Sequence, residues 1–153
     1  MPKVLTRMAG AAMALVMAAG LPAGCGYGMA GTWVDDPGNW SRVFQSTKPP
    51  DVTVVHSKYW RSPHWTFEFA YYFEIAPNPK LKEQLFSKNK LRRMIGDEAA
   101  KAKANSFGEV PVWFAPKAAS EYDIWVFEGE PDRNFRMLID KTSGVVFLSD
   151  YQV

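Results

Sequence analysis

The chain has few of the residues from which small disulfide-bonded or metal-binding modules are built. It contains a single cysteine, which excludes both a disulfide framework and a cysteine-rich zinc module. Its two histidines are His56 and His64, whereas a zinc site needs three or four ligands, so we expect no metal and no cofactor. No apolar run reaches the roughly 18–20 residues of a membrane-spanning helix.

Local catalytic motifs are also missing, namely a G-x-S-x-G elbow, a P-loop, a G-x-G-x-x-G turn and a metalloprotease helix. An enzyme assembled from distant residues stays open, with His56 or His64 as its base. Glu68 and Glu74 lie on one predicted strand, roughly 20 Å apart, which is too far for paired catalytic carboxylates at about 5–9.5 Å. The acidic segment 128–134 lacks the glycine and closing glutamate of a calcium loop, and we interpret it as a turn.

What is present begins with an export signal. Lys3 and Arg7 precede residues 8–20, an apolar stretch of 13 residues rich in Ala, Gly and Met, and small residues follow. A basic start, a short apolar middle and small residues near the cleavage site are typical of a secretory signal peptide. The sequence therefore predicts an exported protein.

The segment Leu21-Pro-Ala-Gly-Cys25 resembles the lipobox of bacterial lipoproteins, with Leu21 one place earlier than the leucine of that family. The resemblance implies that Cys25 becomes the mature N-terminus and carries acyl chains such as palmitate. Gly26 stands where an aspartate would signal retention in the inner membrane, so the resemblance implies the outer membrane, facing the periplasm. The alternative is cleavage after Ala30, an A-x-A-like site, which would leave a soluble periplasmic protein.

The net positive charge of the chain comes from this export signal. Removing residues 1–24 deletes two of the 18 Lys and Arg residues and none of the 16 Asp and Glu residues, which leaves a formal balance of zero. The mature protein therefore gives no argument for binding nucleic acid. We expect a signal peptide over 1–24, a lipidated Cys25 with a tether over 25–35, and a single domain over 36–153.

Two predicted strands follow a short helix at about 37–45. Residues 65–75 alternate between aromatic and polar side chains, and residues 52–60 form a second strand candidate joined to them by a hairpin. A register whose paired positions sum to 126 sets Lys58 against Glu68 and keeps that lysine off the apolar face. It places His56 opposite Ala70 on a face that we expect to meet solvent.

The remaining pattern predicts one helical region and three strands. Asn78 and Pro79 start a helix whose apolar stripe continues to Ile95, and 111–116 is an apolar strand or strap bounded by prolines. Strands at 122–127, 135–140 and 145–152 close the chain, with a hairpin turn at 141–144. We expect an α+β, two-layer fold in which an antiparallel sheet of about five strands (β-β-α-β-β-β) packs on one main helical region.

Two groups of residues are candidates for contact with a partner. Aromatic and arginine side chains, which are enriched in binding hot spots, crowd the end of the first hairpin: Tyr59, Trp60, Arg61, His64 and Trp65. Residues 80–103 carry eight basic residues against three acidic ones, including Arg92 and Arg93 beside an apolar stripe. This segment is either a solvated helix face or a cationic patch that meets anionic lipid or an acidic partner.

These observations favour a membrane-anchored periplasmic lipoprotein that acts as a non-enzymatic binding module for a protein or an envelope component. An immunity or inhibitor protein against an envelope-targeting toxin is one version of it, by analogy of class. The alternatives are a hydrolase acting on envelope polymers and a structural lipoprotein of an envelope complex.

Overall fold

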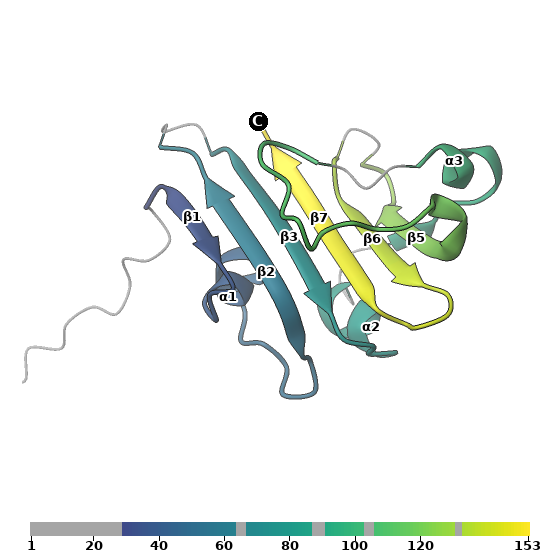
Figure 1. Ribbon diagram of the computed structural model, residues 1–153, viewed down its shortest axis with the longest axis horizontal. Coiled ribbons are helices and arrows are strands. Elements are labelled where there is room, and N and C mark those ends of the chain that lie inside the picture. Colours follow the sequence, from purple (N-terminus) through teal and green to yellow (C-terminus); the bar gives the residue numbers. More distant parts are fainter. Residues whose placement is uncertain (1–28, 64–66, 87–90, 103–105, 131–132) are drawn as a thin grey trace, which may run out of the picture.

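The computed structural model describes residues 29–63, 67–86, 91–102, 106–130 and 133–153. Within these residues the chain forms one antiparallel sheet of seven strands in the order β1-β2-β3-β7-β6-β5-β4 (Figure 1). The strands are β1 Gly31–Val34, β2 Val54–Arg61, β3 Phe69–Ile75, β4 Leu91–Arg93, β5 Tyr122–Phe127, β6 Arg136–Asp140 and β7 Val146–Gln152. The sheet is open, and β1 and β4 are its two edges.

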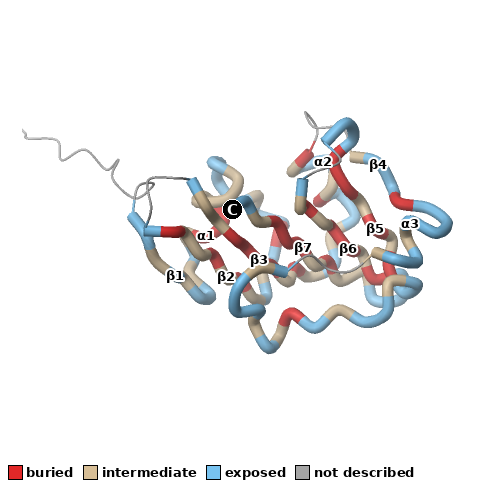
Figure 2. The backbone as a smooth tube through the Cα atoms, turned by 90° about the horizontal axis from the view of Figure 1, so that it is seen from above, coloured by how far each residue is buried: buried red, intermediate tan, exposed pale blue. Residues whose placement is uncertain are grey.

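Short helices connect the strands. They are α1 Asn39–Phe44, α2 Leu81–Phe86, α3 Gly96–Lys101 and the 3-10 helix η1 Ala119–Glu121. As Figures 1 and 2 show, α1 and α2 lie on one side of the sheet, while the segment 106–118 crosses the other side. No helix among the described residues is long and apolar enough to cross a membrane.

The buried side chain of Asn39 joins α1 to the sheet. Its Nδ2 atom donates hydrogen bonds to the carbonyl oxygen of Trp33 in β1, at 3.1 Å, and to Ser57 Oγ in β2, at 3.0 Å. Just before the helix, the Asp36 carboxylate accepts a hydrogen bond from the Gly38 N–H at 2.6 Å. This bond satisfies a backbone N–H at the start of the helix, where N–H groups have no acceptor within the helix itself. The predicted helix at 37–45 is therefore present, and its place over β1 and β2 is set by Asn39.

The main core lies between the sheet and the helices α1 and α2. Tyr71, Phe73 and Ile75 of β3 point to this side, as their alternation predicts. The other buried members of this cluster are Trp40, Val52, Tyr59, Leu81, Phe86, Phe127, Phe135, Met137, Val146 and Leu148. Burying each large apolar side chain stabilises the fold by about 1.5–3 kcal/mol, so this layer dominates stability.

The second face of the sheet is covered, which corrects the expected solvent-facing side. Ala70 and Tyr72 of β3 are buried under Phe114 of the crossing segment 106–118. The Tyr72 hydroxyl donates to the carbonyl oxygen of Phe107 and accepts its N–H, both at 2.8 Å. A further apolar cluster around Ile124 and Leu138 packs near α3. The domain therefore has a layer on each side of its sheet, and the two-layer expectation was wrong.

The strand count also differs from the sequence-based expectation of about five. Residues 31–34, assigned above to the tether, form β1 and pair with β2. Residues 91–93, assigned above to the helical region, form β4 and pair with β5. The helical stripe therefore stops after α2, and Ile95 is exposed rather than packed. In place of one main helical region, the described residues form two separate six-residue helices, α2 and α3, with β4 between them.

The hairpin register was predicted with the correct faces but the wrong offset. Lys58 lies opposite Tyr72 and Tyr59 opposite Tyr71, and His56 lies opposite Glu74 rather than Ala70. Because the offset from the predicted register is four residues, each side chain keeps its face. The connection is longer than predicted, since Ser62 donates its N–H to the carbonyl oxygen of Glu68 at 3.1 Å and the loop lies between them.

Candidate binding pocket

The predicted hairpin cluster is divided between the two faces of the sheet. Tyr59 and Arg61 line a pocket beside α1, whereas Trp60 packs on Phe107 on the opposite face, with ring centroids 5.7 Å apart. His64 and Trp65 lie outside the described residues. The alternation of a strand therefore separates neighbours that the sequence groups together.

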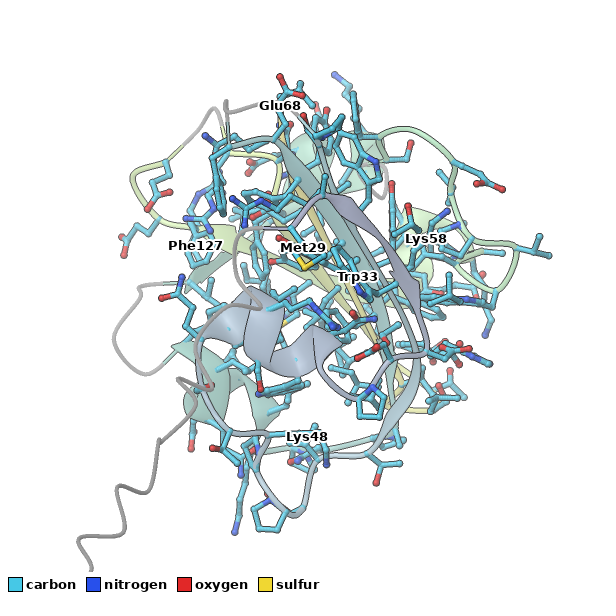
Figure 3. All side chains as sticks on the ribbon, turned by 90° about the vertical axis from the view of Figure 1, so that its left-hand side faces the viewer. Met29, Trp33, Lys48, Lys58, Glu68 and Phe127 are labelled. Atoms are coloured by element: carbon cyan, nitrogen blue, oxygen red, sulfur yellow. The ribbon has the colours of Figure 1, made fainter. Side chains whose placement is uncertain are left out.

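The pocket that contains Tyr59 and Arg61 has a volume of about 390 Å³ and opens to solvent. Its lining comes from the chain before β1, from β1, α1 and β2, and from the loop after β2. The residues are Met29, Trp33, Arg42, Gln45, Tyr59, Arg61 and Phe67. Figure 3 shows Met29 and Trp33 at the end of the molecule where the described chain begins. Sequence reasoning found two of these residues and missed the other five.

The pocket has an aromatic floor and an apolar rim. Trp33 of β1 lies opposite Tyr59 of β2, with ring centroids 5.7 Å apart, because the two residues pair in the β1–β2 ladder. Tyr59 is 6% exposed and belongs to the core. Phe67 and Met29 are 53% and 67% exposed at the rim. Exposed large apolar side chains beside a concavity are typical of binding sites.

Two guanidinium groups lie against this aromatic surface. Arg42 is 4.7 Å from the centroid of Trp33, and Arg61 is 4.6 Å from the centroid of Phe67. Both distances fall within the range of cation–π attraction. Both arginines therefore line the pocket with their guanidinium groups over aromatic rings.

The charges of the two arginines are balanced differently. Arg42 donates to the Asp36 carboxylate at 2.8 Å and to Asn39 Oδ1 at 2.9 Å, and this hydrogen bond lowers the pKa of Asp36. Arg61 takes part in none of the salt bridges between described residues. Burial raises the pKa of Tyr59, and the nearby charge of Arg61 acts in the opposite direction. The pocket therefore has one guanidinium charge without a described carboxylate.

Arg92 and Arg93 lie far from this pocket, at the opposite edge of the sheet in β4. Arg92 forms two hydrogen bonds with Glu98, at 2.8 and 2.6 Å, and these bonds raise the pKa of Arg92. Arg93 pairs with Asp123. Both predicted contact residues are thus already paired with carboxylates within the domain.

The basic segment 80–103 does not form one helix face. It is divided among α2, β4 and α3, and Lys88, Lys90 and Lys103 lie outside the described residues. Lys82 of α2 lies 3.8 Å from the ring centroid of Trp125. The described part of this segment therefore forms no continuous helix face, whether solvated or facing a partner.

His56 has a carboxylate neighbour, but it lies at the surface. Its Nδ1 atom is 3.3 Å from Asp35, and its ring stacks on Trp113 with centroids 5.3 Å apart. Both members of the pair are partly exposed, at 41% and 49% of their side-chain surface. Asp35 also accepts the N–H of Ser57 at 2.8 Å, which gives it a structural role. Within the described residues no group of three or more His, Cys, Asp or Glu side chains could hold a metal ion.

One buried titratable group escaped the sequence analysis. Asp150 of β7 is 2% exposed, and its carboxylate accepts a hydrogen bond from Arg133 Nε at 3.3 Å. Burial raises the pKa of Asp150 to about 6, and its Oδ1 atom has no hydrogen-bond partner. The sequence contained the signal, because Asp150 continues the inward positions of Val146 and Leu148 in the strand. The group lies in the core beside Tyr71, and we assign it a structural role.

The comparisons with known proteins give no family. The chain matches none of the protein-family models, curated proteins or solved structures with which it was compared. The candidate site therefore rests on its own geometry.

Proposed function

We propose that the protein is a membrane-anchored periplasmic lipoprotein whose domain is a non-enzymatic binding module for an envelope component. The observation that supports this function is the open pocket of Trp33, Tyr59, Arg61 and Phe67, which combines exposed apolar surface with a guanidinium charge. Such a pairing suits a ligand that has both an apolar and an anionic part.

The position of the pocket along the chain supports the anchoring part of the proposal. Met29 lines the pocket and follows Cys25 by four residues, which can extend at most about 14 Å. An acylated Cys25 would hold the pocket close to the membrane surface, and several acyl chains give the stable attachment that one chain does not. The same geometry would serve an immunity protein that meets its toxin at that membrane.

The hydrolase alternative receives less support. His56 lies outside the pocket, on the other side of the sheet from Tyr59, and its described carboxylate neighbour is occupied by the Ser57 N–H. His56 is therefore separated by the sheet from the pocket that Arg61 and Phe67 line. We therefore propose binding rather than catalysis.

The anchoring proposal is tested on the protein isolated from the bacterial envelope. Mass spectrometry of the mature N-terminus should find a diacylglyceryl-modified Cys25, and fractionation should place the protein in the membrane fraction. The Cys25→Ala variant should move to the soluble fraction. A mature chain that begins at Gly31 without modification would refute the anchor.

A further inference from the structure

We infer that the pocket binds one anionic phospholipid, with the phosphate beside Arg61 and the first carbons of the acyl chains against Phe67 and Met29. The inference builds on the proposed function, since the anchoring membrane is the source of this ligand. It rests on three features of the described residues, which are charge, apolar surface and position.

Charge selects an anion. The guanidinium of Arg42 is offset by Asp36 at 2.8 Å, whereas Arg61 takes part in none of the salt bridges between described residues. The guanidinium of Arg61 is oriented by its contact with the Phe67 ring, whose centroid lies 4.6 Å away. A guanidinium that is oriented before binding loses less entropy when it pairs with a phosphate, and its planar fork fits two phosphate oxygens.

The exposed apolar side chains of the pocket favour an amphiphilic ligand over a free anion. Phe67 and Met29 are 53% and 67% exposed and both line this one pocket, so their apolar surfaces lie beside the guanidinium of Arg61. The cavity volume of about 390 Å³ is at the lower end of small-molecule sites, which suits a glycerophosphate group with the beginning of its chains. The open mouth leaves the rest of each chain in the bilayer.

The position of the pocket near the proposed anchor favours a membrane lipid as the ligand. Trp33 and Arg61 are residue types that favour the interface between headgroups and hydrocarbon, because each has an apolar body and a polar end. Met29 follows Cys25 by four positions in the sequence, so a chain of that length can separate Met29 from the proposed anchor by at most about 14 Å. A lipid of the same leaflet can therefore reach the pocket without leaving the membrane.

The test uses short-chain lipids that are soluble as single molecules, so that binding does not depend on the anchor. Isothermal titration calorimetry on the mature protein, below the critical micelle concentration, compares dihexanoyl phosphatidylglycerol, dihexanoyl phosphatidylcholine and inorganic phosphate. We expect phosphatidylglycerol to bind at least about tenfold more tightly than either of the others.

Two variants test the residues, and a third is the matched control. Arg61→Gln should weaken the binding of phosphatidylglycerol about tenfold, with little effect on phosphatidylcholine. Phe67→Ala should weaken both lipids several-fold. Arg93→Gln removes an exposed arginine from the opposite edge of the sheet and should change neither affinity. Thermal unfolding of each variant checks that the domain stays folded.

Each outcome bears on one proposal. Unchanged phosphatidylglycerol binding in both pocket variants, equal affinity for the two lipids, or equally tight inorganic phosphate would overturn the inference. No lipid binding would overturn it too, and would leave an acidic protein segment as the better occupant. Acylation of Cys25 is read separately by mass spectrometry, so lipid binding without acylation refutes the anchor alone, and acylation without lipid binding refutes the inference alone.

Discussion

Asp150 makes the stability of this domain depend on pH in a direction opposite to that of most carboxylates. Its side chain is buried against Tyr71, and the hydrogen bond from Arg133 Nε, at 3.3 Å, does not replace the water that it loses. Arg133 and Arg136 act to lower the pKa of Asp150, but desolvation is larger and raises it to about 6. The folded protein therefore binds a proton more tightly than the unfolded chain does.

The magnitude follows from the two pKa values. The carboxyl has a pKa of 3.8 in the unfolded chain and about 6 in the folded domain, and at 1.36 kcal/mol per pH unit this difference is about 3 kcal/mol. Since the folded pKa is the higher one, this stabilisation is complete below pH 3.8 and is lost as the pH rises through 6. Between pH 5 and 7 the free energy of unfolding should fall by about 1.3 kcal/mol.

Other carboxylates do not mask this loss. Hydrogen bonds lower the pKa of four described acids, which are Asp36, Asp51, Glu98 and Asp140. Groups of that kind lose their contribution only as the pH falls below their unfolded values, so they are constant above about pH 5. Between pH 5 and 7 these four acids therefore do not contribute to the change in the free energy of unfolding that Asp150 causes.

Urea unfolding followed by tryptophan fluorescence, at steps from pH 5 to 7, measures the effect. The Asp150→Asn variant cannot ionise at this position and should lose the fall of about 1.3 kcal/mol. Glu109→Gln removes a carboxylate that is 93% exposed and should keep the wild-type slope, which makes it the matched control. An Asp150→Asn variant with the same slope as the wild type would refute the assignment of the proton to this residue.

Three further predictions concern the hairpins. Gly144→Ala should cost about 1–2 kcal/mol in urea unfolding, because Gly144 has φ +74° and a Cβ there would lie 3.2 Å from Pro77 Cβ. Asp140 has its pKa lowered to about 2 by the N–H groups of the turn, so its stabilisation is lost as the pH falls from 4 toward 2, and Asp140→Asn should show a smaller drop in melting temperature over that range. Trp60→Ala should lower stability by about 2 kcal/mol while leaving lipid affinity in calorimetry unchanged, because Trp60 packs on Phe107 outside the pocket.

The last three strands were predicted closely because their signals are local. The predicted strand at 122–127 coincides with β5, and the predicted strand at 145–152 begins one residue before β7. Alternation over five to seven residues defines each strand, and Gly144 supplies the positive φ that the turn between β6 and β7 requires. Pattern and turn chemistry agree here, so the local sequence was sufficient.

The two edge strands could not be predicted in the same way. β1 has four residues and β4 has three, which is too short for alternation to be recognised. Each becomes a strand because a longer neighbour offers unpaired backbone groups, β2 in one case and β5 in the other. The apolar residues Leu91 and Met94 fit a helical spacing equally well, and only the tertiary contact decides between the two structures.

The covered second face shows the limit of an alternating pattern. Ala70 and Tyr72 occupy the less apolar positions of β3, and both residue types are compatible with either water or a core. Tyr72 is buried because Phe107 satisfies its hydroxyl through two backbone hydrogen bonds, from a segment 35 residues away. A partner so distant in the chain leaves no trace in the sequence around β3.

Only two of the seven residues of the candidate site, Tyr59 and Arg61, were predicted, for the same physical reason. Aromatic and arginine residues at the end of β2 did indicate a binding region, but a strand sends consecutive side chains to opposite faces. Only Tyr59 and Arg61 reach the pocket, and the surface is completed by Trp33 from a segment taken for a tether and by Arg42 from a short helix. The residues of this pocket come from separate elements and are brought together only by the fold. They therefore form no local sequence motif that a pattern could have identified.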